Sequence, residues 1–231
     1  QLFNTLNEMA KKINCFIPVQ EKNQVIETVN GLKANELVAK IYLLATEDFN
    51  EAIEGCEVVK IDSLQSTATV KKIAELSDAP YSLIYTKYTT LELGYFALER
   101  IVNLAEDSNA SMLYADHYQI IDGVKKASPV IDYQFGSLRD DFNFGSVLFY
   151  NAEALKCGAS RMKQDYKFAG LYDLRLKVAQ KGELCHINEY LYTEIENDNR
   201  KSGAKIFDYV DPKNRGVQIE MEQACTEHLK E

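Results

Sequence analysis

Short apolar runs alternate with amphipathic stretches along the first half of the chain. Mainly apolar runs of four or five residues, bounded by polar residues, glycine or proline, predict buried strands. These runs lie at 15–19, 41–45, 58–62, 81–85 and 112–115. Apolar residues at helical spacing between them predict helices over 20–31, over 66–76 and from the polar corner 86–90 to Asn109. This alternation predicts an α/β fold with a mainly parallel, Rossmann-like sheet and helices on both faces.

The second half of the chain begins with a long segment that has no clean hydrophobic period. Residues 129–145 are polar, aromatic and punctuated by glycine, and a loop of this length inside a compact domain is usually functional. The pattern after it predicts a strand at 146–150, a short helix at 151–155 and a helix from 168 that stops at Gly182. One or two edge strands at 184–193, a charged loop at 197–203 and an amphipathic last helix follow.

Composition narrows the class of protein and its partners. A chain of 231 residues can bury one sizeable core, and its net charge of −9, from 26 basic and 35 acidic residues, argues against nucleic acid or an anionic membrane as the main partner. The five scattered cysteines indicate reduced thiols in a cytoplasmic protein. No run approaches transmembrane length, so we expect contact with a membrane surface only through regions outside this chain. Because the chain opens without Met, we expect a fragment of a longer protein.

The segment 79–123 gives the strongest functional signal, because it reads as strand, polar corner, helix and strand. Ligands of open α/β sheets sit outside the carboxyl ends of strands, so the corner after Tyr85 is a natural site. The corner and the following Leu91-x-x-Gly94-x-x-x-Leu98-Glu99-Arg100 resemble the GT-A glycosyltransferases, especially the large inverting family that builds bacterial surface polysaccharides. The resemblance spans roughly residues 13 to 195. It implies the GT-A nucleotide-diphospho-sugar transferase fold as a single domain over 1–231, with a nucleotide-binding part at about 13–123 and an acceptor part at about 124–231.

The resemblance also implies which residues contact the nucleoside of the donor. An Ile-Pro-Val strand end meets the base in the family, and here that end is Pro18 and Val19. Acidic residues follow the next two strands, at Glu47, Asp48 and Asp62. Carboxylates suit this position because uracil N3–H and ribose hydroxyls are donors. The alternative for Glu47 and Asp48 is a polar turn that starts a helix.

The metal-binding motif of the family is degenerate in this chain. Relatives carry Asp-x-Asp at the corner, which holds a divalent cation against the diphosphate, and the matching positions here are Thr86, Lys87 and Tyr88. We therefore expect the Lys87 ammonium to neutralise the diphosphate in place of the metal. A rival alignment places Mg²⁺ or Mn²⁺ at Asp116 and His117 on the next strand. A third interpretation leaves Lys87 in solvent and the domain without catalysis.

The remaining implied site residues lie in the acceptor part. Relatives carry Glu-Asp before an apolar helix, and the matching Tyr172-Asp173 makes Asp173 the base that deprotonates the acceptor hydroxyl, facing the same cleft as Lys87. The alternative is an i,i+4 pair between Asp173 and Lys177 on a solvated face. Arg139 and Arg200 are implied diphosphate contacts. Their alternatives are an ion pair of Arg139 with Asp140 or Asp141, and a solvated turn around Arg200.

These observations leave three functions open. The first is an inverting glycosyltransferase that moves a sugar from a UDP- or GDP-type donor to a glycan or other hydroxyl acceptor. The second is a non-catalytic GT-A relative that binds a nucleotide, a glycan or a protein partner. The third is a sugar-phosphate nucleotidyltransferase, against which stands the lack of a glycine-rich phosphate loop after the first strand.

Overall fold

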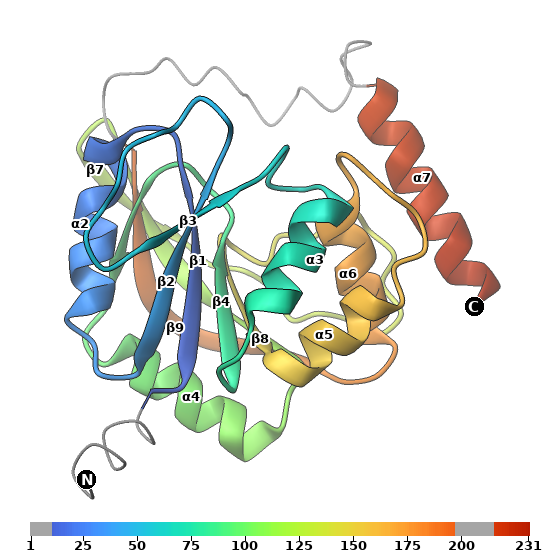
Figure 1. The fold of residues 1–231 in the computed structure, drawn as a ribbon. Coiled ribbons are helices and arrows are strands. Elements are labelled where there is room, and N and C mark those ends of the chain that lie inside the picture. The colour runs from blue at the N-terminus through green and yellow to red at the C-terminus, as the bar shows by residue number, and fades with distance from the viewer. Residues whose placement is uncertain (1–10, 197–214) are drawn as a thin grey trace, which may run out of the picture.

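The computed structural model describes residues 11–196 and 215–231, which form one curled sheet with helices on both faces (Figure 1). The first half contains β1 (Ile13–Val19), α2 (Lys22–Lys33), β2 (Val38–Ala45), β3 (Glu57–Lys60), α3 (Thr67–Leu76) and β4 (Tyr81–Tyr85). All of these elements were predicted. Strands β1 to β4 are parallel and lie in the order β3-β2-β1-β4, so the chain builds outward from β1 and then returns to its other side.

The second half extends the same sheet with mixed strand directions. It contains β5 (Thr90–Leu93), α4 (Ala97–Ser108), β6 (Met112–Ile121), β7 (Val124–Ser128), β8 (Val147–Asn151), α5 (Ala152–Ser160), α6 (Gly170–Ala179), β9 (Leu184–Ile195) and α7 (Arg215–Lys230). The full strand order is β3-β2-β1-β4-β8-β6-β9-β5, with β7 paired to β6. Strand β8 is antiparallel to both β4 and β6, whereas β6 and β9 are parallel. The α/β class is therefore confirmed, and the purely parallel part ends at β4.

Three strands differ from the sequence-based expectation. Strand β5 occupies Thr90–Leu93, where a helix was expected to begin, because it pairs with β9 and its Leu91 N–H donates to Thr28 Oγ1 at 2.9 Å. Strand β9 is one continuous strand inside the sheet, and the expected edge strands are wrong. Strand β7 was not predicted. It follows a tight turn in which Asp122 and Gly123 have φ values of 51° and 73°, as a two-residue hairpin requires.

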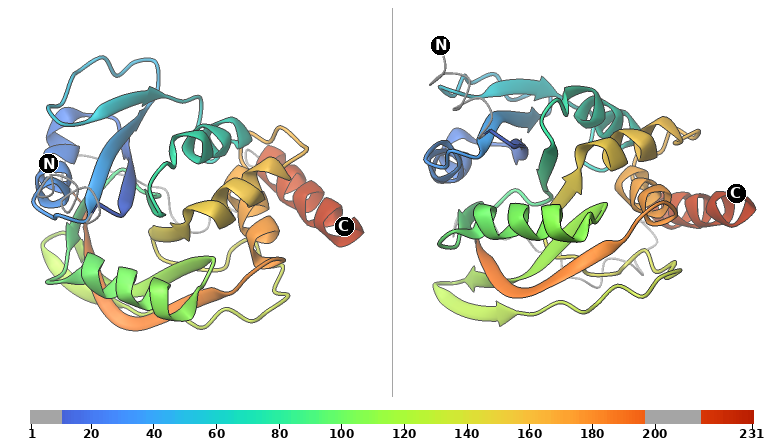
Figure 2. Two further views of the ribbon diagram at one scale, coloured as in Figure 1. Left: turned by 60° about the horizontal axis from the view of Figure 1, so that its bottom comes forward. Right: turned by 90° about the horizontal axis from the view of Figure 1, so that it is seen from below.

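The core consists of two apolar layers, because successive strand residues point to opposite faces of the sheet. Ile17 and Leu43 lie in the layer under α2 and α4, and their neighbours Phe16 and Leu44 lie in the layer under α3, α5 and α6. Figure 2 shows the strong bend of β9, drawn in orange. The last helix, α7, packs on α6 through Ala224. None of the described helices is long and apolar enough to cross a membrane.

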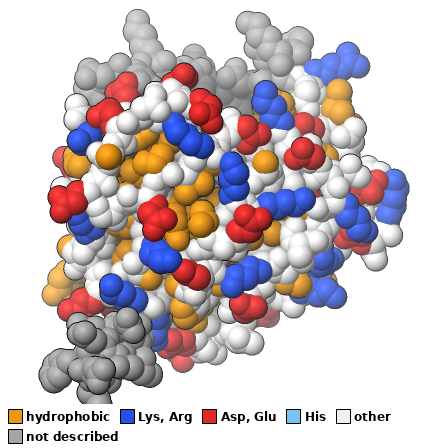
Figure 3. Space-filling model, in the orientation of Figure 1, with side chains coloured by type: hydrophobic (Ala, Val, Ile, Leu, Met, Phe, Trp, Pro, Cys, Tyr) orange, Lys and Arg blue, Asp and Glu red, His pale blue; other side chains and the backbone are white. Residues whose placement is uncertain are grey.

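Charges of both signs are interspersed over the face shown in Figure 3, around a patch of exposed hydrophobic side chains. This face carries no basic stripe of the kind that nucleic-acid-binding proteins present.

Candidate functional site

The strand order reverses at β1, and this reversal marks the candidate site. Strands β1 and β4 pair only from Ile13 and Tyr81 to Phe16 and Ile84. Beyond Phe16, β1 continues against β2 alone, while β4 continues against β8. Ligands of open α/β sheets bind in the crevice outside the carboxyl ends at such a switch point. The candidate site therefore consists of residues that follow β1, β2, β3 and β4.

The carboxyl ends of β1 and β2 offer an apolar side and an acidic side. Pro18 and Val19 end β1 and are buried, whereas Glu47 and Asp48 follow β2 with exposed side chains. The turn that carries the two acids is held from its backbone, because Lys60 Nζ donates to the carbonyls of Thr46 and Glu47 at 3.2 Å each. The carboxylates of Glu47 and Asp48 are thereby turned outward, where a ligand can reach them.

Asp62 follows β3 and contacts Ser66, the N-cap residue of α3. Its Oδ1 accepts hydrogen bonds from Ser63 N–H at 2.8 Å and from the hydroxyls of Ser66 and Thr69 at 2.6 and 3.4 Å. Burial by itself raises the pKa of Asp62, but these hydrogen bonds outweigh it and the pKa lies below its ordinary value. Asp62 is therefore ionised at neutral pH, and its described hydrogen bonds use one carboxylate oxygen. This contact with the N-cap residue was not predicted.

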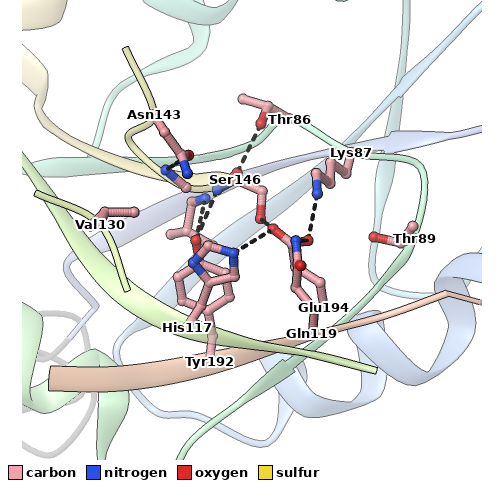
Figure 4. A network of polar contacts seen from close by, with 12 residues as sticks. Thr86, Lys87, Thr89, His117, Gln119, Val130, Asn143, Ser146, Tyr192 and Glu194 are labelled. Carbon is pink, nitrogen blue, oxygen red and sulfur yellow. Dashed lines mark hydrogen bonds and ion pairs between the residues drawn. The ribbon is translucent and has the colours of Figure 1, made fainter. Parts of the chain in front are cut away.

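The corner after β4 is fixed to two other strands. Thr86 N–H donates to Ser146 O at 2.9 Å, next to β8, and Lys87 Nζ lies 2.5 Å from Glu194 Oε2 on β9 (Figure 4). The Lys87 side chain is 42% exposed, whereas that of Glu194 is 4% exposed. Tyr88 is half-buried against the layer under α3, and burial raises its pKa. The interpretation that Lys87 merely points to solvent is wrong, because the ammonium is anchored.

Glu194 is the centre of a polar network that the sequence did not reveal. Its carboxylate accepts hydrogen bonds from Lys87, from Ser146 Oγ and, at 3.0 Å, from Gln119 Nε2. It also faces His117 Nε2 at 3.3 Å. Burial tends to raise the pKa of Glu194, but these hydrogen bonds and the charge of Lys87 hold it below its ordinary value. Because the donors come from three separate segments and β9 carries a second glutamate, Glu189, no local sequence pattern identified Glu194.

His117 and Tyr192 form the inner wall of this network. Their rings stack at 4.9 Å between centroids, and Tyr192 Oη accepts a hydrogen bond from Ser146 N–H at 2.8 Å. Burial lowers the pKa of His117, so its imidazole is neutral at pH 7, and its buried Nδ1 has no hydrogen-bond partner among the described residues. Gly145 packs over both rings with φ 71°, and a Cβ there would lie 2.4 Å from Tyr192 Oη.

Asp116, the alternative metal ligand, belongs to a different cluster. Its Oδ1 accepts from Val130 N–H at 2.8 Å and lies 2.9 Å from His186 Nε2, while His186 Nδ1 lies 2.7 Å from Asp132. Asp116 and His117 share none of these partners, so the two side chains do not converge on one cation. Across 11–196 and 215–231, no group of three or more His, Cys, Asp or Glu side chains is arranged to hold a metal ion.

The corner itself does not fit a divalent cation. Thr86, Lys87 and Tyr88 supply no carboxylate, and the carboxylate that reaches this corner, Glu194, already contacts the Lys87 ammonium. A cation such as Mg²⁺ needs oxygen ligands rather than a neighbouring positive charge. The use of Mg²⁺ or Mn²⁺ stays a prediction without a site in the described residues.

Asp173 lies in the first turn of α6 and is buried. Its carboxylate forms an ion pair with Lys177 at 3.7 Å, and Lys177 also contacts Glu231 at 2.6 Å. Both side chains of the i,i+4 pair are nearly inaccessible, so the expected solvated face is wrong. The expectation that Asp173 faces the same cleft as Lys87 stays a prediction, because its side chain is only 4% exposed and its ion-pair partner Lys177 lies on the same helix. Burial raises the pKa of Asp173.

Two arginines, Arg139 and Arg200, were expected to contact the diphosphate. Arg139 is exposed and forms two hydrogen bonds of 3.0 Å with Asp141, which is the ion pair that the sequence offered as the alternative to a diphosphate contact. Its backbone carbonyl accepts from Arg175 on α6, which fixes the 129–145 loop against that helix. Arg200 lies outside the described residues.

Comparison with known proteins gives a match at the level of the fold. No protein-family model matches the chain, and no curated protein matches it by sequence. Similar solved structures include Staphylococcus aureus TarS 1–349 in complex with UDP-GlcNAc, with a TM-score of 0.67 and 10% identity over 94% of this chain and 66% of that one. The UDP complex of TarS 1–349 gives a TM-score of 0.57 and 9% identity, over 80% of this chain and 61% of that one. TarS 1–349 alone gives a TM-score of 0.57 and 10% identity, over 79% of this chain and 60% of that one.

The chain thus spans less than two thirds of these TarS structures. At this level of identity the similarity concerns the fold. The α/β sheet of this chain, curled and flanked by helices, has the GT-A-like fold of the glycosyltransferase TarS.

Proposed function

We propose that this chain is a glycosyltransferase domain that takes a sugar from a UDP- or GDP-type donor and transfers it to a hydroxyl of a glycan with inversion. The observation that carries the proposal is the switch point between β1 and β4, with polar side chains at the carboxyl ends of the strands around it. Further support comes from the shared fold, which extends over 94% of the chain in a structure that holds UDP-GlcNAc.

The nucleoside would lie across the ends of β1, β2 and β3. Pro18 and Val19 supply an apolar edge for the base, and the outward carboxylates of Glu47 and Asp48 accept hydrogen bonds from base or ribose donors. Asp62 is ionised and held in one orientation by the start of α3, which suits a fixed acceptor for a ribose hydroxyl. A preoriented acceptor loses less conformational entropy on binding than a mobile one.

The diphosphate would lie at the β4 corner against Lys87. An ammonium has three N–H donors, and one of those on Lys87 is directed at Glu194. The others point away from the buried carboxylate, where the half-exposed ammonium can meet phosphate oxygens. Glu194, held by Ser146 and Gln119, keeps the ammonium at this corner, so the charge that develops on the leaving diphosphate meets a fixed cation.

The proposed transfer is a single displacement. The acceptor oxygen forms a bond to the anomeric carbon while the bond from that carbon to the diphosphate oxygen breaks, and the acceptor proton passes to a base. The family resemblance assigns this proton to Asp173. The raised pKa of Asp173 suits a base, whereas its burial opposes the assignment, so a variant must decide it.

A specific observation favours a second candidate, a non-catalytic relative that binds the nucleotide. The Asp-x-Asp carboxylates are absent and the carboxylate assigned as base is enclosed, while the acidic ends of β2 and β3 needed for nucleoside binding are present. Binding without turnover is what this combination would give.

The experiment that separates the candidates is a transfer assay with a panel of UDP- and GDP-sugars and glycan acceptors. We expect one donor to be consumed, with release of its nucleoside diphosphate and an inverted anomeric configuration in the product by NMR. Binding of a donor without release supports the non-catalytic candidate. Absence of both binding and release across the panel rejects both candidates.

A further inference from the structure

An open cavity of about 550 Å³ lies between α2, β5 and α4, at the β5 end of the sheet. None of the residues assigned above to the nucleotide or the acceptor lines it. Its volume falls in the range of small-molecule sites. The lining combines two aromatic side chains, three carboxylates and the amide of Asn35, supplied by Tyr95, Phe96, Glu27, Glu92 and Glu99.

The two aromatic side chains are held outward by a rigid turn. Tyr95 is 91% exposed and Phe96 is 61% exposed, and their rings lie edge to face at 4.2 Å. Phe96 has φ 54°, a left-handed conformation that costs about 1–2 kcal/mol for a residue with a side chain. The turn is fixed because Gly94 N–H donates to Leu191 O at 2.8 Å, and a Cβ on Gly94 would lie 2.9 Å from that oxygen. Exposed aromatic surface held at such a cost indicates a binding surface.

The carboxylates of the cavity are not neutralised. No Lys, Arg or His lines the cavity, and no cationic nitrogen of residues 11–196 or 215–231 forms an ion pair with Glu27, Glu92 or Glu99. Glu99 Oε1 accepts from Asn35 Nδ2 at 2.9 Å, whereas Glu99 Oε2 is enclosed and has no hydrogen-bond partner in the described part of the chain. A carboxylate shielded from water in this way is stabilised through space by a cation that enters the cavity.

We propose that this cavity binds an alkylammonium group. Such a group is attracted both by the aromatic faces of Tyr95 and Phe96 and by the unneutralised carboxylates. A neutral sugar lacks the electrostatic attraction to the carboxylates, and an anion is repelled by them. The same chemistry is carried by a small quaternary ammonium such as choline and by the side chain of a lysine in a peptide. The site goes beyond the proposed transferase function, because it shares no residue with the nucleotide site.

The test is an ¹H–¹⁵N NMR titration of the full chain, without nucleotide, with choline chloride and with its neutral isostere 3,3-dimethyl-1-butanol. We expect saturable shifts of the amides of 91–99 with choline, and affinity about tenfold or more weaker for the isostere. N-acetyl-lysine amide and a neutral chito-oligosaccharide form two further arms. Saturable binding of the lysine derivative in preference to choline identifies a peptide as the source of the cation.

Substitutions of exposed side chains test the cavity without disturbing the folded core. Tyr95→Ala and Glu27→Gln change exposed side chains and should each weaken choline binding about fivefold or more, while Phe135→Ala removes an 88% exposed ring outside the cavity and should not. Equal affinity for choline and its isostere, binding of the oligosaccharide alone, or no saturable shift with any probe overturns the proposal. Because nucleotide is absent, none of these outcomes bears on the transferase function.

Discussion

Lys87 and Glu194 are separated by 107 positions in the chain, yet the Lys87 ammonium lies 2.5 Å from the Glu194 carboxylate. The contact joins the corner after β4 to β9, the last strand along the described chain. It places a cation at the corner that the family resemblance matches to Asp-x-Asp. The partner of Lys87 is buried and receives further hydrogen bonds from Ser146 and Gln119, so the cation is part of a fixed network.

Removing the charge of Glu194 should change how stability depends on pH. A carboxyl whose folded-state pKa is lowered contributes stability that is present above its unfolded pKa, about 4.3, and is lost as the pH falls through the folded value. We therefore expect Glu194→Gln to lose roughly 2–3 kcal/mol of unfolding free energy at pH 7. The difference from the wild-type protein should shrink below about pH 4.3 in urea titrations. A constant difference from pH 3 to pH 7 would contradict the charged network.

Two glycines form a matched pair that tests the packing of the network. Gly145 and Gly136 both have left-handed φ values, 71° and 83°, but a Cβ on Gly136 meets nothing within 4 Å. Gly136→Ala should cost about 1–2 kcal/mol for the backbone alone. Gly145→Ala should cost about 1–3 kcal/mol more, because its Cβ collides with Tyr192 Oη. Equal midpoints of thermal unfolding for the two variants would show that the contact with Tyr192 is loose.

Variants of Asp62 and Ser66 distinguish a role in nucleoside binding from a role in stabilising the start of α3. Ser66 caps α3 by accepting from Thr69 N–H at 3.1 Å and donates to Asp62 Oδ1 at 2.6 Å, so Ser66→Ala should lower stability by about 1 kcal/mol and weaken nucleotide affinity less than a change of Asp62 itself. Asp62→Asn retains an oxygen that can accept the capping hydrogen bonds and removes the charge offered to the ribose. We expect its affinity for the donor to fall about tenfold. Unchanged affinity in a titration would show that Asp62 only stabilises the start of α3 and does not bind the nucleoside.

Asp173→Asn should not destabilise the protein at pH 7. Burial raises the folded-state pKa of Asp173, so its ionised form costs stability above that pKa, and the cost disappears as the pH falls below the unfolded value. Lys177 keeps Glu231 as a partner in the variant. Denaturant unfolding at pH 7 and at pH 3 measures the effect, and a lower stability of the variant at pH 7 would contradict it. In a transfer assay, loss of turnover with intact donor affinity assigns the base role to Asp173, and equal turnover confines the residue to packing.

The early fold followed from the sequence because its signals are local. Apolar runs such as Tyr81–Tyr85 are strands bounded by turn residues, and Ser66 is a recognisable cap, so both were placed to within a residue. Strand β5 was missed because Thr90–Leu93 is short and derives its pairing from β9, far along the chain. The turn at Asp122 and Gly123 was recognised, but the polar β7 after it has no apolar pattern of its own.

The site was only partly accessible from the sequence, for a related reason. Positions that follow a strand could be named in advance, as with Glu47 and Lys87. The side chains that complete the network could not, because Ser146, Gln119 and Glu194 meet only through the strand order β8-β6-β9. The surroundings of Asp173 depend on the docking of α7 on α6, which a helical pattern alone does not specify.

The most direct test of the account is a calorimetric titration of the full chain with UDP- and GDP-sugars in the presence of EDTA. We predict saturable binding of one nucleotide class without metal, and a loss of about tenfold or more in affinity for Lys87→Ala, with the exposed Lys126→Ala as an unaffected control. Absence of binding to every donor, with and without metal, would contradict the nucleotide-sugar site. Binding that EDTA abolishes and Mn²⁺ or Mg²⁺ restores would contradict the role of Lys87 and make Asp116 the ligand to test.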